Sequence, residues 1–186
     1  MSKISFKAGN MLYPLPAVMV SCGREGEKPN IITLAWVGTI CSDPAMVSIS
    51  VRPSRYSYDI IKSTKEFVIN LVTEELTPAC DYAGVRSGRD VDKFKKLNLT
   101  PYISEYMATP AIEESPVNIY CKVDEIKHLG SHDMFIATVV GVTVDDKYMD
   151  ENGSFRLDNA GLMAYSHGEY FGLGDKLGSF GYTVKK

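Results

Sequence analysis

The sequence shows no surplus of one charge and no long apolar run, and these absences exclude two classes of partner. Its 186 residues carry 20 basic and 23 acidic side chains, a formal net charge of -3. That balance is too even to neutralise the phosphates of a nucleic acid or to bind an anionic membrane surface. No stretch approaches the roughly 18 to 20 apolar residues of a membrane-spanning helix. Neither nucleic acid nor membrane is therefore an expected partner.

Cysteine is also scarce. The four cysteines are Cys22, Cys41, Cys80 and Cys121. They form no CxxC pair, which argues against a zinc knuckle and against a disulfide-stapled secreted scaffold. The N-terminal segment lacks the continuous apolar stretch of a signal peptide, because two prolines interrupt it. A cytoplasmic protein with reduced thiols is expected.

What is present is the composition of a globular chain, with 45% apolar and 23% charged residues. No repeat and no linker rich in serine, glycine or proline divides it, so residues 1–186 are expected to form a single domain. The sequence contains neither a GxxxxGK[ST] phosphate loop nor a GxSxG elbow, which excludes P-loop nucleotide binding and the serine chemistry of α/β-hydrolases.

Six β-rich runs dominate the chain and are separated by turn residues. They cover residues 17–22, 31–40, 46–51, 66–72, 115–129 and 132–145. In the third run, Val47, Ile49 and Val51 alternate with serines, which indicates a sheet with one face in the core. Strands that follow one another with short turns favour an antiparallel β-barrel with added helices over a doubly wound parallel sheet.

Helices are expected to be short and inserted between strands. One should begin after Pro53, with Ser54 as its N-cap, and a second should run from an Asp90 cap to Leu97. The segment 148–186 is rich in glycine and aromatic residues and has no long periodic run. It is expected to form loops and short turns.

The first candidate binding segment is Arg52-Pro53-Ser54-Arg55-Tyr56-Ser57, where a strand passes into a helix. Free amides at a helix start, two guanidinium groups and several hydroxyls suit a phosphate monoester. The alternative is an ordinary capped helix with solvated arginines, which is the commoner role of such a cluster.

A second segment, Arg86-Ser87-Gly88-Arg89-Asp90 followed by Lys93, offers the same chemistry. Gly88 permits close backbone approach, while Ser87, Arg89 and Lys93 supply donors and positive charge. A solvated surface helix explains the segment equally well.

Asn30, Thr33 and Trp36 could meet the polar edge and the plane of a ring-shaped ligand, although a tryptophan in a strand is more often a core residue. His128 and His132 are four residues apart, but they flank a hairpin turn and have no clear third ligand, so no metal site is expected. His132 alone could offer a hydrogen bond or a proton to a ligand, or could be a satisfied turn residue.

Taken in order, six segments resemble the flavin reductase-like family of FMN-binding split barrels, and more closely its flavoredoxin-like branch. They are PNIITLAW, CSDPAMVSISVRPSRYSYDII, EFVINL, SGRDVDKF, SHDMFIATVVGV and YFGLGDKLGSFGY. The resemblance implies a homodimer, a six-stranded antiparallel Greek-key split barrel, and one FMN per subunit in a groove near the dimer interface.

The resemblance also assigns residues by position. Asn30, Thr33, Ala35, Trp36 and Val37 match the strand that meets the isoalloxazine ring. The segment that holds the ribityl chain and phosphate is matched by Ser50, Val51, Arg52, Ser54, Arg55, Tyr56 and Ser57. A second phosphate clamp is matched by Ser87, Gly88, Arg89 and Lys93. Arg55 and Lys93 are expected at the surface. His132 resembles a histidine near nicotinamide and flavin, with Ser131 in place of an acidic residue.

Three functions are compatible with these residues. The leading hypothesis is an FMN-dependent oxidoreductase that takes hydride from NADH or NADPH and passes electrons to free flavin, ferric iron or a redox partner protein. The second is a flavoredoxin-type electron carrier that a partner protein reduces. The third is a non-redox FMN-binding or purely structural barrel. In the first two the cofactor supplies the chemistry and the protein supplies orientation and electrostatics.

Overall fold

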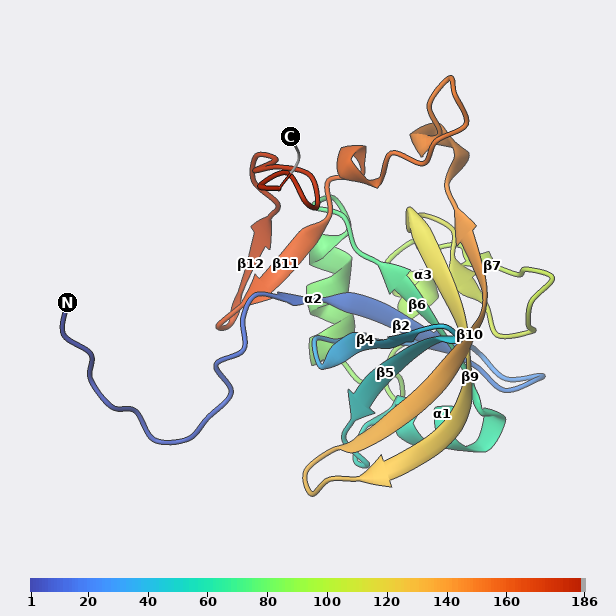
Figure 1. Cartoon of the computed structure of the whole chain (residues 1–186). Coiled ribbons are helices and arrows are strands. Elements are labelled where there is room, and N and C mark those ends of the chain that lie inside the picture. The colour runs from blue at the N-terminus through green and yellow to red at the C-terminus, as the bar shows by residue number, and fades with distance from the viewer. Residues whose placement is uncertain (185–186) are drawn as a thin grey trace.

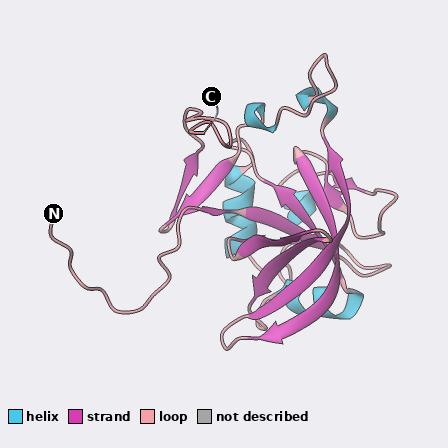
Figure 2. Ribbon diagram, in the orientation of Figure 1, coloured by secondary structure: helices cyan, strands magenta, loops and turns pink. Residues whose placement is uncertain are grey.

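The computed structural model describes residues 1–184, and its main feature is a seven-stranded antiparallel sheet that curls into a half-barrel (Figure 1, Figure 2). The strands lie in the order β3-β2-β6-β9-β10-β5-β4. Their bounds are Val18–Cys22 for β2, Asn30–Leu34 for β3, Val37–Ser42 for β4, Ala45–Val51 for β5, Glu66–Leu71 for β6, Val117–His128 for β9 and Asp133–Val144 for β10. The prediction of a mainly β split barrel is confirmed.

The sheet has seven strands and not six because the run 31–40 is broken at Ala35 and Trp36. These two residues join β3, at one end of the sheet order, to β4, at the other end. They therefore cross the seam of the barrel. The Trp36 carbonyl accepts a hydrogen bond from the Ser50 amide at 2.9 Å, which ties the crossing to β5.

The barrel interior forms the main core. Val47, Ile49 and Val51 of β5 are all buried while the serines between them are half-buried, as the alternation predicts. The core also contains Val18, Val20, Cys22, Ile32, Leu34, Tyr58, Ile60, Ile61, Phe67, Ile69, Cys121, Phe135 and Ala137. Among the described residues no cysteine is in a disulfide, and Cys22, Cys80 and Cys121 are buried.

Three helices are inserted between the strands: α1 (Tyr56–Thr64), α2 (Thr77–Val85) and α3 (Lys93–Lys96). The predicted caps were wrong. Arg55 stands at the N-cap of α1 and makes no side-chain cap bond, because the chain turns at Arg52–Arg55 before the helix starts. Asp92, not Asp90, caps α3 and accepts a hydrogen bond from the Lys95 amide at 3.2 Å.

The C-terminal part contains more regular structure than the sequence predicted. β11 (Met163–Ser166) and β12 (Glu169–Gly172) form a hairpin, and β1 (Leu15–Pro16) pairs with β11. The two-residue turn between β11 and β12 is His167-Gly168, with φ of 50° and 95°. A tight hairpin turn requires positive φ at both positions. The short 3₁₀ segments η1 (Asp146–Tyr148) and η2 (Leu157–Asn159) precede the hairpin, and β7 (Pro101–Tyr102) pairs with β8 (Ala111–Ile112).

The N-terminal segment extends away from the rest of the molecule (Figure 1). Phe6 and Leu12 in this segment, and Leu177 and Phe180 in the C-terminal segment, are exposed apolar side chains. Within residues 1–184, no helix has the length and apolar character needed to cross a membrane.

Candidate functional site

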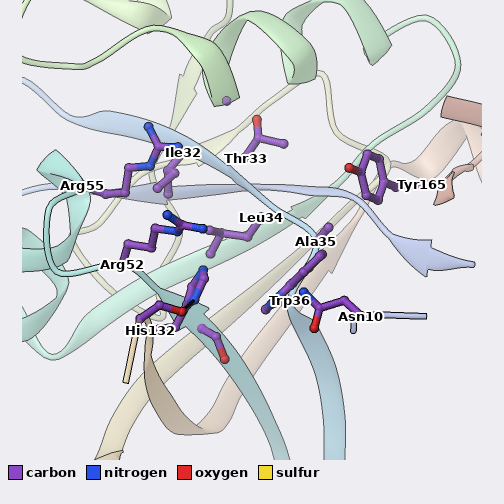
Figure 3. A pocket seen from close by; sticks show the side chains of 13 residues that line it. Asn10, Ile32, Thr33, Leu34, Ala35, Trp36, Arg52, Arg55, His132 and Tyr165 are labelled. Atoms are coloured by element: carbon purple, nitrogen blue, oxygen red, sulfur yellow. Dashed lines mark hydrogen bonds between the residues drawn. The ribbon is translucent and has the colours of Figure 1, made fainter. Parts of the chain in front are cut away.

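A cavity of about 450 Å³ lies at the barrel seam, where Trp36 faces the tip of the β9–β10 hairpin (Figure 3). Its wall combines the end of β3, the seam crossing, the loop after β5 and the hairpin tip. The lining residues are Asn10, Ile32, Thr33, Leu34, Ala35, Trp36, Ser50, Arg52, Arg55, Gly84, Ser131, His132 and Tyr165. One side is apolar, and Arg52, Arg55 and His132 contribute nitrogen donors, as a ring with polar edges requires.

A smaller cavity of about 110 Å³ adjoins the first, because Ile32, Arg55 and Gly84 line both. It lies between the start of α1, the end of α2 and α3. The other lining residues are Asn30, Ser54, Tyr56, Ser57, Ala83, Arg86, Ser87, Gly88, Arg89 and Lys93. Four of the lining side chains are cationic and four carry a hydroxyl. No acidic residue of the described part of the chain lines this cavity. This donor set suits an anion.

Lys93 is the unusual member of the small cavity, because its side chain is buried and not at the surface as the sequence predicted. It is only 3% exposed, since α3 packs against β3. Its Nζ donates to the carbonyl oxygens of Ile31 and Ala83, each at 2.6 Å. Burial lowers the pKa of Lys93 from 10.5 to about 8. A buried ammonium without a carboxylate partner is costly unless an anion joins it.

The small cavity is closed on one side by a tight contact between Gly88, Asn30 and Tyr56. The Asn30 amide donates to the Ser57 hydroxyl at 2.7 Å, and both side chains are buried. A Cβ on Gly88 would lie 2.1 Å from Asn30 Oδ1 and 2.7 Å from Tyr56 Cδ1. The Arg89 guanidinium lies 5.5 Å from the centre of the Tyr56 ring and donates to the Ser54 carbonyl at 3.3 Å. Only glycine fits at position 88.

His132 lies at the hairpin tip, beside the large cavity (Figure 3). Its Nδ1 is 2.9 Å from the Ser131 hydroxyl. Burial and the neighbouring guanidinium groups of Arg52 and Arg55 lower the pKa of His132. The imidazole is therefore neutral at neutral pH, and its ring can donate one hydrogen bond and accept another. His128 does not line this cavity, and its Nδ1 lies 2.8 Å from Oδ2 of Asp133.

The structure brings most of the predicted site residues together. The large cavity is lined by Thr33, Ala35, Trp36, Ser50, Arg52, Arg55 and His132, and the small cavity by Asn30, Ser54, Arg55, Tyr56, Ser57, Ser87, Gly88, Arg89 and Lys93. Val37 and Val51 line neither. Val37 faces a neighbouring groove beside the N-terminal segment, and Val51 is completely buried in the barrel core.

Several lining residues were missed from the sequence. Ile32 and Leu34 are apolar neighbours of predicted residues on β3, and Ala83 and Gly84 come from the end of α2. Asn10 and Tyr165 come from segments that only the tertiary fold brings to the seam. The strand pattern around Thr33 could have suggested Ile32, but no local signal distinguishes the others.

The two adjoining cavities fit a flavin mononucleotide. The phosphate would take the small cavity, where Lys93, Arg55 and Gly88 line the wall and where a Cβ at position 88 would collide with Asn30 and Tyr56. The ring would take the large cavity beside Trp36 and His132. When bound, this cofactor supplies two-electron and one-electron redox chemistry.

Comparison with known proteins agrees with this geometry. A protein of Archaeoglobus fulgidus without an assigned function is 34% identical over 139 residues, which cover 75% of this chain and 77% of that protein. The structure of flavoredoxin of Desulfovibrio vulgaris (Miyazaki F) superposes with a TM-score of 0.91 at 29% identity, covering 99% of this chain and 100% of that chain. An FMN-binding protein from Thermus thermophilus shares the fold, with a TM-score of 0.79 at 21% identity over 96% of this chain and 97% of that chain.

The family model described as flavin reductase like domain matches residues 10–174. This range contains every lining residue of the two cavities. The chain therefore belongs to the flavin reductase-like family.

Proposed function

We propose that the chain is an FMN-dependent oxidoreductase that uses NADH or NADPH to reduce FMN at N5, with free flavin, ferric iron or a redox partner protein as acceptor. The observation that carries this proposal is the pair of adjoining cavities. The small cavity is lined by cationic side chains, and the ring of Trp36 forms part of the wall of the larger one. Family membership supports a flavin-related redox function.

In this proposal the protein binds and orients, and no acid or base is obligatory. Lys93 and Arg55 hold the phosphate, and the backbone at Ala35 and Trp36 meets the ring. Positive charge near N1 and O2 of the ring would favour the reduced, anionic flavin. Arg52 and Arg55 are the cations that line the large cavity, whereas Lys93 lies in the small one.

A flavoredoxin-type electron carrier is the second candidate. The similarity to a flavoredoxin over almost the whole of both chains favours it. Such a carrier would bind FMN but would be reduced by a partner protein and not by a nicotinamide nucleotide. The third candidate, a non-redox FMN-binding barrel, would show no turnover with either donor.

The proposal includes a homodimer in the cytoplasm, without nucleic acid or membrane as partners. The exposed apolar side chains of the two terminal segments support self-association, because Phe6, Leu12, Leu177 and Phe180 lie unpacked on the single chain.

The deciding experiment is a visible absorption spectrum of the FMN-loaded protein under anaerobic conditions, with NADH and then NADPH added. Bleaching of the flavin bands by either nucleotide supports the reductase. Bands that persist until dithionite is added contradict the reductase and favour the electron carrier. Absence of flavin bands after incubation with FMN and removal of unbound FMN would contradict both proposals.

Replacing Arg55 with alanine is expected to weaken FMN binding by about three- to tenfold. The guanidinium is solvent-exposed, so its charge is screened and contributes about 1 kcal/mol, the upper end for exposed pairs. Titration of flavin fluorescence measures the effect. Arg24, an arginine paired with Glu27 at 3.2 Å outside both cavities, provides the control as Arg24→Ala. Equal FMN affinity in Arg55→Ala and the wild type would contradict the assignment.

A further inference from the structure

A buried carboxylate lies next to the site, in the residue that follows His132. Asp133 is the first residue of β10, is only 4% exposed and lines neither cavity. Its Oδ2 accepts a hydrogen bond from the Tyr58 hydroxyl at 2.5 Å and lies 2.8 Å from Nδ1 of His128. Burying a carboxylate is costly unless hydrogen bonds compensate it, and the proposed chemistry does not use this one.

The partners of Asp133 come from two different elements. Tyr58 is in the first turn of α1, the helix that begins directly after Arg55. Its ring is 5% exposed and packs edge-on against Phe135 of β10, with ring centres 5.5 Å apart. His128 is the last residue of β9. The carboxylate therefore joins both strands of the hairpin to the start of α1.

The strand register shows what this junction holds. Asp133 pairs with Val51 across β10 and β5, so His132 lies beside Arg52. The His132 carbonyl accepts a hydrogen bond from the Leu129 amide at 3.1 Å, which closes the hairpin tip. Gly130, at the tip, has a φ of 108° and open space around it. Displacement of Asp133 would therefore displace His132. The tip around Gly130 would move with it, because the space around Gly130 is open.

We propose that Asp133, Tyr58 and His128 form a positioning network that fixes His132 beside the large cavity and connects it to the phosphate-binding end of α1. This inference rests on the proposed function, because the network would hold His132 against a flavin whose phosphate is bound at the start of α1. None of the three network residues contacts the cavity itself. They act through His132 and the α1 turn.

The charged groups that face the network come from α1, β9 and the turn after β5, and they include Asp59 beside Tyr58. Asp133 faces Tyr58 and Lys62 of α1 and His128 of β9, and the Tyr58 hydrogen bond is the largest cause of the lowered pKa of its carboxyl. The same bond raises the pKa of Tyr58 to about 12. His132 faces Arg52 and Arg55, which with burial lower the pKa of its imidazole.

The test is an NMR titration of the histidines in flavin-free Tyr58→Phe protein. The chain has 3 histidines, so each can be followed separately. If Tyr58 positions His132, loss of its hydroxyl lets the imidazole move out of its pocket and away from the two guanidinium groups. The pKa of His132 is then expected to shift upward, towards its ordinary value.

Tyr120→Phe is the matched control. Tyr120 is fully buried in β9, and its hydroxyl lies 3.2 Å from the hydroxyl of Thr143 in β10. This variant should lower the melting temperature without moving the pKa of His132. An unchanged His132 pKa in a folded Tyr58→Phe protein would overturn the proposal and leave the network a purely structural role. Because the titration needs no flavin, its result is independent of whether the chain binds FMN.

Discussion

Replacing Lys93 with methionine is expected to weaken FMN binding by about 10- to 100-fold while leaving riboflavin binding unchanged. A hydrogen bond to a charged group contributes about 1.5 to 3 kcal/mol, and about 1.4 kcal/mol corresponds to a factor of ten in Kd. Riboflavin shares the ring and the ribityl chain but lacks the phosphate. The difference between the two flavins therefore isolates the contact that Lys93 makes. Titration of flavin fluorescence with each variant measures it.

The fold should survive this substitution. Lys93→Met removes two hydrogen bonds to the carbonyls of Ile31 and Ala83, but it also removes the cost of burying an ammonium. The matched control is Lys95→Met, which changes an exposed lysine on the same helix. Equal weakening of FMN and riboflavin binding by Lys93→Met would show that Lys93 supports the site structurally and does not contact the phosphate.

The same residue predicts how FMN affinity depends on pH. Burial lowers the pKa of Lys93 to about 8 in the flavin-free protein, and a phosphate dianion beside it would raise that pKa in the complex. Below about pH 8 the lysine is already charged, so binding takes up no proton. Above about pH 8 binding must take up a proton, and the affinity falls as the pH rises. Lys93→Met and riboflavin should both lack this decline.

The sequence identifies both segments that line the small cavity, because the signal of each segment is local. Ser54 to Ser57 stand where a strand passes into a helix, and Ser87 to Arg89 form a small-residue turn, so their donors are recognisable without tertiary structure. Nothing local places the two segments at one cavity. That convergence depends on α3 packing against β3 and on the Asn30–Ser57 hydrogen bond. From the sequence, only the family resemblance predicts that the two segments meet at one phosphate site.

Lys93 shows where local patterns cannot decide. It is one of three lysines in the segment Lys93-Phe94-Lys95-Lys96, and by composition all three belong on a solvated helix face. Only Lys93 and Phe94 are buried. Their burial follows from the packing of α3 against β3, where Lys93 reaches the Ile31 carbonyl. That packing is a tertiary contact, which the local pattern of charges does not reveal.

The seam of the barrel escaped prediction for a different reason. Residues 31–40 are a continuous run of strand-forming residues, so neither composition nor alternation marks a break at Ala35 and Trp36. The break is a requirement of closure, because β3 and β4 are the two ends of the sheet order. Trp36 is half-buried at this point and lines the large cavity. The core role, which is the commoner one for a tryptophan in a strand, therefore does not hold for Trp36, and its place in the cavity wall is consistent with the predicted contact with a ring.

Replacing Gly88 with alanine is expected to abolish tight FMN binding, with a loss of about 100-fold or more. The added Cβ would lie 2.1 Å from Asn30 Oδ1 and 2.6 Å from Asn30 Cγ. Asn30 cannot retreat freely, because it is buried and donates a hydrogen bond to Ser57 at 2.7 Å. Either the turn carrying Ser87 and Arg89 moves outward or the Asn30–Ser57 bond breaks. Both changes open the cavity that would hold the phosphate, and loss of two hydrogen bonds to a charged phosphate, at about 1.5 kcal/mol each, corresponds to about 100-fold in Kd.

Stability separates this local effect from general unfolding. Overpacking of this kind costs about 1 to 3 kcal/mol, which a chain of this size tolerates, so Gly88→Ala should fold with a lowered melting temperature. Gly38→Ala is the control, since a Cβ there meets nothing within 4 Å. Isothermal titration with FMN on both variants gives the answer. A folded Gly88→Ala protein that binds FMN like the wild type would show that the Gly88, Asn30 and Tyr56 contact does not border the phosphate, and the small cavity would lose its assignment.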